Sequence, residues 1–418
     1  MSTRNLTDAT LQKTAQVNTH FSPSAPIDSL ALFAGRLQQI NTMLNAITQR
    51  GQHAILYGER GVGKTSLARI MNEVVSRAQI GRITCCIINC TAQDDYDSIW
   101  HKAFRELRFT YTAEKIGLRE KTEDKTVTLN DILESISDKD VIGPEDIRYT
   151  LQVVQKSFII IDELDRLHDP TARTLLADTI KTLSDHSVDC TILLVGIADT
   201  VDELIQEHAS IERALVQVHM PRMTHEEIGE LLDKALDAAR MSIDLSAKAR
   251  IAELARGLPH YAHLLGQHSA LAAIEDSRDI IDVSDIQAAM RATVAQAQSS
   301  IQTLYHTATT SSRKNNLFGK VLLACALAQC DELGYFSAVD VCQPLTKIIG
   351  KSATINAFSQ HLQDFCDEKR GPVLQRKGQP RGYRYRFINP LIVPFVIIKG
   401  YYQGLIADWK YTEKTLFD

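Results

Sequence analysis

Residues 58–65 read Gly-Glu-Arg-Gly-Val-Gly-Lys-Thr and fit the pattern G-x-x-x-x-G-K-[ST] of a phosphate-binding loop. The apolar residues 54–57 that precede the loop predict a strand, and a helical pattern begins at Thr65. Glycines at these positions let backbone N–H groups surround phosphate oxygens, and the N-terminus of the helix adds positive potential. A phosphate loop between a strand and a helix therefore predicts an α/β fold that binds a nucleoside triphosphate.

Two side chains of this loop have specific expected roles. The Lys64 ammonium reaches the β- and γ-phosphates and assists catalysis, and the Thr65 hydroxyl is a ligand for Mg²⁺. The residues expected to contact the nucleotide are Gly58, Glu59, Arg60, Gly61, Val62, Gly63, Lys64, Thr65 and Ser66.

An apolar run at residues 157–161 ends in Asp162 and Glu163, about a hundred residues after the loop. In a parallel α/β sheet both motifs lie at the carboxyl edge, where ligands bind. Asp162 would then hold Mg²⁺ through water, and Glu163 would orient and activate the attacking water. The alternative is a solvated carboxylate pair at the start of a helix. Asp165 and Arg166 follow, and they fit either a supporting role or a helix cap and a surface pair.

Composition agrees with an ordinary globular protein, because 44% of the 418 residues are hydrophobic and 23% are charged. The sequence has no apolar run of 18 residues and no signal peptide, which predicts a cytoplasmic protein without a membrane partner. The eight cysteines include no C-x-x-C pair, so neither a zinc site nor a redox motif is predicted. Residues 311–418 contain 15 Lys and Arg against 9 Asp and Glu, although the whole chain carries a net charge of −5. This segment can approach a polyanion.

Apolar strands alternate with helical patterns up to about residue 223, and the pattern is purely helical after that. Three helical patterns and two strand-like runs in the last hundred residues predict a winged helix-turn-helix. The expected parts are a flexible arm at 1–20, a core at 21–223, a helical lid at 224–297, a linker at 298–316, a winged helix at 317–400 and a tail at 401–418.

Together these features resemble the AAA+ ATPases of the origin-recognition and helicase-loader group. The resemblance rests on Phe33-Ala34-Gly35-Arg36, the phosphate loop, Ile88-Asn89-Cys90, the box Asp162-Glu163-Leu164-Asp165, the lid and the winged helix. It implies an α/β fold with a P-loop AAA+ parallel sheet core, an all-helical lid and a C-terminal winged-helix domain. It also implies ATP and Mg²⁺ as cofactors, ATP hydrolysis, and a homo-oligomer whose subunits share ATP sites.

The resemblance implies two further catalytic residues. Asp199 follows an apolar strand at the position where the family has a polar sensor of the γ-phosphate, usually Asn or Thr. A carboxylate there requires a bridge through water or Mg²⁺. Arg213 occupies the position of the arginine finger, which reaches the γ-phosphate of a neighbouring subunit. Its alternative is a surface pair with Glu212 or Glu207.

Two further nucleotide contacts follow from the resemblance. His260 stands after Gly257-Leu258-Pro259, where the family commonly has a sensor arginine. Histidine is shorter and only partly charged near neutral pH, so a structural role is the alternative. The adenine site lies by resemblance near Leu32 and Phe33, and a simple core role for Phe33 is the alternative.

The expected hairpin of the winged helix is basic. Residues 370–386 contain no Asp or Glu, and alternation places Tyr383 and Tyr385 on one face and Arg384 and Arg386 on the other. The arginine face and the wing tip would grip phosphates of duplex DNA while the third helix lies in the major groove. The residues expected to contact DNA are Arg376, Lys377, Arg381, Arg384 and Arg386. The alternative is a winged helix that contacts protein.

Two functions remain open on these grounds. The first is an initiator- or loader-like ATPase that couples its nucleotide state to DNA binding. The second is a regulatory ATPase of a mobile-element or phage-defence system, whose main partner is another protein or an effector enzyme. The polar N-terminal arm and a polar insertion at about residues 109–143 keep the second open.

Overall fold

The computed structural model describes residues 8–27, 29–77, 83–115, 121–136, 141–154, 156–205, 211–312, 316–379 and 382–406. The chain divides into two compact units, and the core unit spans Pro26–Pro221. The helical unit combines Met1–Ala25 with Arg222–Asp418.

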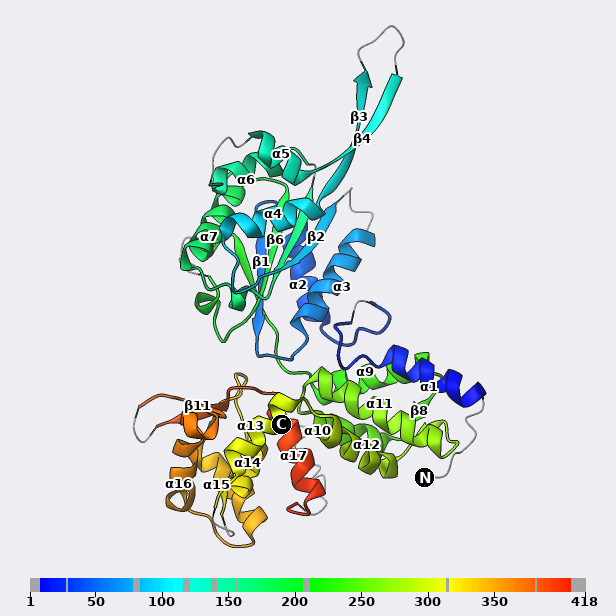
Figure 1. Cartoon of the computed structure of the whole chain (residues 1–418), viewed down its shortest axis with the longest axis vertical. Helices are drawn as coiled ribbons and strands as arrows, with labels where there is room; N and C mark the ends of the chain where they lie inside the picture. The colour runs from blue at the N-terminus through cyan, green and yellow to red at the C-terminus, as the bar shows by residue number, and fades with distance from the viewer. Residues whose placement is uncertain are drawn as a thin grey trace. The chain divides into compact units, whose positions relative to one another are not determined.

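A five-stranded parallel sheet in the order β2-β5-β6-β1-β7 forms the centre of the core unit (Figure 1). The strands are β1 (His53–Gly58), β2 (Thr84–Asn89), β5 (Ser157–Asp162), β6 (Cys190–Ile197) and β7 (Leu215–His219). Every residue of β5 is buried, as expected for a strand that is covered on both faces. Gly58 pairs with Ile197, and Asn89 pairs with Asp162. The phosphate loop and the acidic strand end therefore meet at one edge of the sheet.

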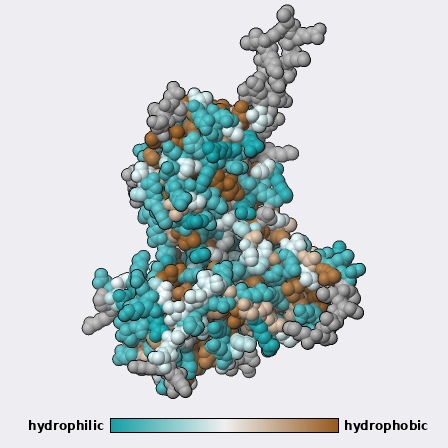
Figure 2. Space-filling model, in the orientation of Figure 1, coloured by the Kyte–Doolittle hydropathy of each residue, from teal (hydrophilic) through white to brown (hydrophobic). Residues whose placement is uncertain are grey.

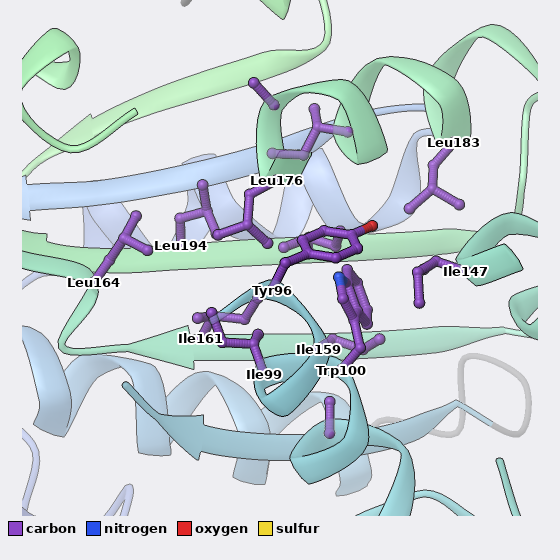
Figure 3. Close-up of a cluster of buried hydrophobic side chains, with 14 of the residues drawn as sticks. Tyr96, Ile99, Trp100, Ile147, Ile159, Ile161, Leu164, Leu176, Leu183 and Leu194 are labelled. Carbon is purple, nitrogen blue, oxygen red and sulfur yellow. The ribbon is translucent and has the colours of Figure 1, made fainter. Parts of the chain in front are cut away.

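Helices cover both faces of this sheet. They are α2 (Leu37–Thr48), α3 (Lys64–Arg77), α4 (Tyr96–Glu106), α5 (Leu129–Ile136), α6 (Pro144–Leu151), α7 (Pro170–Asp185) and the 3₁₀ turns η1 (Leu164–Arg166) and η2 (Val201–Glu203). In the core cluster of Figure 3, Tyr96 and Trp100 of α4 lie among aliphatic side chains of β5, β6, α6 and α7. The Tyr96 hydroxyl is hydrogen-bonded to Thr179 at 2.6 Å, so this buried polar atom is satisfied.

The polar segment after α4 contains an antiparallel hairpin of β3 (Arg108–Lys115) and β4 (Lys121–Thr128). Its two strands pair only with each other among the described strands, and they extend away from the rest of the core unit (Figure 1). The predicted insertion is thus a two-stranded arm that is followed by α5.

The helical unit begins with a correction, because residues 8–20 form helix α1 (Asp8–His20) rather than a flexible arm. Val17 is fully buried, and the Phe21 ring packs on Gly266, where an added Cβ would lie 2.6 Å from Phe21 Cε1. The sequence did not predict this helix because the segment is mostly polar and contains few apolar residues. Residues 1–7 lie outside the described residues.

The lid consists of four helices and two short strands, and α1 packs on its helices α9 and α11. Its elements are α9 (His225–Ala238), β8 (Ser242–Ile243), α10 (Leu245–Ala255), α11 (Pro259–Glu275), β9 (Ile280–Ile281) and α12 (Val283–Gln296). The predicted capping box is present, because the Thr224 hydroxyl accepts from the Glu227 N–H while the Glu227 carboxylate accepts from the Thr224 N–H.

The expected linker is also corrected, since residues 299–309 form helix α13 (Ser299–Thr309) with Ile301 and Tyr305 buried. These two side chains lie one helical turn apart and give the polar segment one apolar stripe. Of the expected tail, Tyr401 and Tyr402 complete the last helix, and residues 407–418 lie outside the described part.

The C-terminal part has the predicted winged-helix fold. It contains α14 (Phe318–Leu327), β10 (Phe336–Ser337), α15 (Ala338–Ile349), α16 (Ile355–Asp364), η3 (Glu368–Arg370), β11 (Leu374–Lys377), β12 (Arg384–Phe387) and α17 (Ile392–Tyr402). The strands form a three-stranded sheet in the order β10-β12-β11, so β11 and β12 are the wing. Hydrophilic residues predominate on the face drawn in Figure 2. Within the described ranges, no helix has the length and hydropathy needed to cross a bilayer.

Candidate functional site

The phosphate loop connects β1 to α3 at the carboxyl edge of the sheet. Gly61 and Gly63 have φ values of 86° and 99°, which disfavour any side chain. Gly58 is required because of close packing: a Cβ at this position would lie 2.5 Å from the Met220 carbonyl oxygen. The glycines of the motif thus permit the backbone path that phosphate binding needs.

Lys64 is buried at the start of α3, with 8% of its surface exposed. Its ammonium donates to the carbonyl oxygens of Gly58 and Glu59, both at 2.8 Å. Desolvation by burial lowers the pKa of Lys64 to about 8, although the carboxylates of Asp165, Asp162 and Glu59 oppose this change. A partly desolvated cation enclosed by the loop is suited to an incoming polyanion.

Asp162 ends β5 beside the loop and is also buried. Its Oδ1 accepts from the Glu163 N–H at 2.7 Å, and its Oδ2 is buried without a hydrogen bond from any described residue. Burial raises the pKa of this carboxyl group above its ordinary value, and the nearby Thr65 hydroxyl opposes the rise. An orphaned carboxylate oxygen next to a threonine hydroxyl fits the ligand set of Mg²⁺, which prefers oxygen ligands and retains water. The described residues contain no cluster of three or more His, Cys, Asp and Glu suited to a metal.

Glu163 follows in a left-handed conformation, with φ of 57° and ψ of 36°. Such a conformation is uncommon for a residue with a side chain and is frequent at functional sites. The Glu163 carboxylate accepts a hydrogen bond from Arg166 at 2.8 Å. Arg166, which the sequence left open between support and a surface pair, is thus the ion-pair partner of Glu163.

Asp165 links the acidic strand end to the neighbouring strand. Its Oδ1 accepts from the Ile197 N–H at 2.8 Å, at the end of β6. Two residues later, the N–H of Asp199 donates to the Glu203 carboxylate at 2.9 Å. The structure therefore brings Asp199 to the same edge as the loop and Asp162, whereas its contact with phosphate stays a prediction.

Ser66 and Phe33 have internal contacts in the core unit. The Ser66 hydroxyl accepts from the Ile27 N–H at 3.2 Å, and Phe33 is buried, with 8% of its surface exposed. The burial of Phe33 agrees with the core role that was its alternative.

Arg36, for which the sequence predicted no role, lies beside the loop. Its guanidinium donates to the carbonyl oxygens of Pro221 at 2.7 Å and of Val62 at 3.5 Å. The sequence feature that could have indicated this position is an arginine between Phe33-Ala34-Gly35 and the amphipathic helix that begins at Leu37.

Arg213 lies at the opposite edge of the sheet from the phosphate loop. It precedes β7, whose Leu215 pairs with His53 at the start of β1, and its carbonyl oxygen accepts from the Gln52 side chain at 3.4 Å. The length of β1, about 17 Å at 3.3 Å per residue, separates this edge from the loop. The Arg213 side chain is exposed, and Glu207 lies outside the described residues.

His260 lies in the first turn of the lid helix α11 and is half-buried in the helical unit. Its Nδ1 donates to the Pro23 carbonyl oxygen at 2.7 Å, which assigns the proton to Nδ1 because a carbonyl only accepts. One ring nitrogen therefore fixes the segment after α1, so His260 has a structural role whether or not it also meets nucleotide.

The basic hairpin differs from its expected arrangement. Arg384 contacts Asp331 at 3.1 Å, and Arg386 donates to the Leu333 carbonyl oxygen at 3.3 Å. Both side chains thus bind the turn before β10. Arg376 pairs with Tyr385 across the wing and so lies on the tyrosine face, with its guanidinium 4.2 Å from the Tyr383 ring centroid.

Arg376, Lys377 and Arg384 are exposed on the wing, although Arg384 is ion-paired with Asp331. Arg381 lies outside the described residues. Arg386 is therefore an internal support, and the exposed cations and α16 are available to a partner.

Comparison with known proteins agrees with this geometry. Residues 47–205 match the protein family described as the AAA domain. No curated protein matches the chain.

Several solved structures are similar. Cdc6p from Pyrobaculum aerophilum is 16% identical, covers 93% of this chain and 99% of its own, and has a TM-score of 0.44. The Orc1 protein of Aeropyrum pernix, solved in complex with DNA, is 14% identical, with coverages of 94% and 97% and a TM-score of 0.43. The Walker-type ATPase paby2304 of Pyrococcus abyssi is 14% identical, with coverages of 90% and 99% and a TM-score of 0.49.

Residues 47–205 match the AAA domain family, so the predicted resemblance to AAA+ proteins is confirmed for this segment. This segment contains the phosphate loop, the acidic box and Asp199.

Proposed function

We propose that the chain binds ATP with Mg²⁺, hydrolyses it between subunits of a homo-oligomer, and couples the nucleotide state to DNA binding through the winged helix. The observation that carries the proposal is the buried Asp162 Oδ2, which accepts no hydrogen bond within the described residues and lies beside Thr65 and the Lys64 ammonium. A buried carboxylate oxygen is costly unless it binds a proton, a donor or a metal.

Each residue at the carboxyl edge has a separate task in this proposal. Lys64 leaves its carbonyl partners for the phosphate oxygens, and the loop N–H groups hold the remaining charge. Thr65 and Asp162 would hold Mg²⁺, which neutralises charge on the phosphates when bound. Glu163 orients the attacking water once its carboxylate turns away from Arg166.

Hydrolysis between subunits is supported by the position of Arg213. Its backbone lies at the amino edge of the sheet, about 17 Å of strand from the loop of its own chain. A fully extended arginine side chain is much shorter than that. An arginine finger at this position therefore acts on the nucleotide of a neighbouring subunit, which makes activity depend on assembly.

Binding of duplex DNA is supported by the exposed surface of α16. Its outward residues Asn356, Gln360 and Gln363 are uncharged and polar, and Lys351 lies just before the helix. Amide side chains can pair with base edges in the major groove, while Arg376 and Lys377 would meet phosphates from the wing.

The second function, control of a partner protein, is favoured by a different observation. Arg386 is bound to the Leu333 carbonyl oxygen and Arg384 is ion-paired with Asp331, which weakens the phosphate contacts expected of these two residues. The β3–β4 arm, which forms a two-stranded sheet of its own among the described strands, supplies a surface for a protein strand.

Two measurements on the full chain test these proposals. Equilibrium binding of ATP with Mg²⁺ should be lost in Lys64→Ala and retained in Lys181→Ala, which removes a cation from the exposed face of α7. Equal affinity of the two variants would reject the assigned site. Fluorescence anisotropy with duplex DNA at increasing salt should give an affinity that falls steeply. No binding at low salt, in protein that binds ATP, would favour the partner-protein function.

A further inference from the structure

Arg36 is a buried charged residue in an unusual backbone conformation. It is 4% exposed and has φ of 64° and ψ of 18° at the N-terminus of α2, directly after Gly35 with φ of 63°. A guanidinium stays charged at every physiological pH, so its burial is costly without acceptors. Two consecutive left-handed residues aim this side chain into the core unit, and such strain is retained where the surroundings require it.

The acceptors of Arg36 belong to two different functional segments. Its Nη2 donates to the Pro221 carbonyl oxygen at 2.7 Å and, more weakly, to the Val62 carbonyl oxygen at 3.5 Å. Val62 is inside the phosphate loop. Pro221 is the last residue of the core unit, and Arg222 is the first of the helical unit after it. One guanidinium nitrogen thus joins the loop to the peptide that connects the two units.

A second contact ties the other end of the loop to the same peptide. Gly58 lies so close to the Met220 carbonyl that a Cβ would be 2.5 Å from its oxygen. The Met220 N–H in turn donates to the Tyr57 carbonyl oxygen at 2.8 Å. The start of the loop thus contacts Met220 directly, and Val62 within the loop is linked to Pro221 through Arg36, so a shift of the loop is transmitted to residues 220–221.

We propose that Arg36 is a positioning residue that couples the state of the phosphate loop to the connecting peptide at residues 220–223. The inference rests on the proposed binding of nucleotide. Phosphates draw the loop N–H groups inward, and the Val62 peptide turns with them. The bond from Nη2 to Pro221 then tightens or lengthens, because the same nitrogen meets both carbonyls. Such coupling is reciprocal, so a fixed connecting peptide also changes nucleotide affinity.

Hydrogen exchange of the full chain, followed by mass spectrometry, tests this coupling. The probe is ADP or a non-hydrolysable ATP analogue with Mg²⁺. In the unaltered protein, nucleotide should slow exchange in peptides covering residues 58–65 and in those covering residues 219–224. Protection of the loop without protection of residues 219–224 would overturn the inference. Absence of protection at the loop would reject nucleotide binding itself, and both proposals would fall.

Arg36→Met should keep protection of residues 58–65 and weaken the nucleotide-dependent protection of residues 219–224, because the contact of Met220 with Tyr57 still remains. The matched control is Arg148→Met, because Arg148 is also a buried arginine of the core unit, bonded to Glu145 and Gln152 away from the loop. It should preserve full protection in both segments. Undiminished protection of residues 219–224 in Arg36→Met would overturn the inference. If Arg36→Met does not fold, Arg36→Lys keeps the buried cation on a shorter side chain that reaches the two carbonyls less well, and it should show the same weakening.

Discussion

Arg166 donates a hydrogen bond to the Glu163 carboxylate, with 2.8 Å between Nη1 and Oε2. Glu163, the proposed activator of water, therefore forms an ion pair with a residue three positions later in the chain. The two side chains are 53% and 42% exposed, and a half-exposed ion pair contributes at most about 1 kcal/mol. The pair therefore restrains Glu163 without sequestering it.

Removal of the Arg166 side chain should release Glu163. We expect Arg166→Ala to raise the turnover number by up to about fivefold, the equivalent of about 1 kcal/mol, with unchanged ATP affinity. Glu163→Gln should bind ATP and lose turnover. Phosphate release under saturating ATP measures both. Arg77→Ala, which breaks the surface pair with Glu73, is the matched control and should have no effect. A fall in turnover of Arg166→Ala would instead assign Arg166 a supporting role in the reaction.

The affinity for ATP should depend on the protonation of Lys64. Burial lowers its pKa to about 8 in the nucleotide-free protein, and the triphosphate binds the ammonium form. Affinity should thus fall as pH rises through 8, by up to about tenfold per pH unit. Calorimetric titrations at pH 7 and pH 9 measure the change. Lys64→Arg keeps its charge over this range, so its affinity should be flat. An equal affinity of the unaltered protein at both values would contradict the prediction.

If Arg213 acts between subunits, two inactive variants should complement each other. Arg213→Ala retains an intact phosphate loop, and Lys64→Ala retains the arginine finger. In a random equal mixture about one quarter of the interfaces combine both intact residues, so phosphate release should recover to about that fraction. Co-assembly is verified by light scattering. Without recovery in a mixture shown to assemble, Arg213 does not complete a shared site.

Substitutions at different positions of the wing should affect either protein stability or DNA affinity. Arg386→Ala removes the contact with the Leu333 carbonyl and should lower the free energy of unfolding by about 1 kcal/mol. The exposed pair Arg376→Gln and Lys377→Gln should leave stability unchanged and reduce the salt dependence of DNA binding by up to about two phosphate contacts. Thermal unfolding and anisotropy titrations measure the two effects. An unchanged salt slope in the double variant would exclude the wing tip from the DNA contact.

The contact between Phe21 and Gly266 should be important for stability. In Gly266→Ala the new Cβ would lie 2.6 Å from the rigid Phe21 ring and 2.8 Å from Leu232 Cδ2. Overpacking costs about 1–3 kcal/mol, and the gain in helix propensity offsets only part of it. Gly319→Ala is the control, because the nearest atom to its added Cβ is 3.9 Å away and it keeps a propensity gain, which is smaller near the start of α14. Chemical denaturation should show opposite signs for the two variants.

The sequence was sufficient for the parts of the fold that have strong local patterns. The loop at Gly58–Thr65 and the strand ending at Asp162 predicted a parallel sheet with both motifs at one edge, which the strand pairing confirms. The winged helix followed from its helices and hairpin in the same way. These elements carry their own glycine, apolar and turn signals, so no tertiary information was needed.

Other features depend on contacts that no local pattern contains. Helix α1 is polar along most of its length, and its apolar anchors on the lid are Val17 and the following Phe21, supplemented by contacts of Lys13 with Asp279 and of Asn18 with Gln267. The bonds of Arg384 and Arg386 to the turn before β10 required knowledge of where that turn lies. Arg36 received no role because its acceptors, Val62 and Pro221, are far apart in the sequence.

The docking of α1 on α9 and α11 has a consequence for synthesis of the chain. Its partners begin at His225, about two hundred residues after α1 leaves the ribosome. At roughly 5–20 residues per second, this delay is on the order of ten to forty seconds. Val17 and Phe21 have no lid to bury them during that time, while the whole core unit is completed. The core unit is thus inserted within the sequence of the helical unit, and α1 is synthesised well before the helices on which it packs.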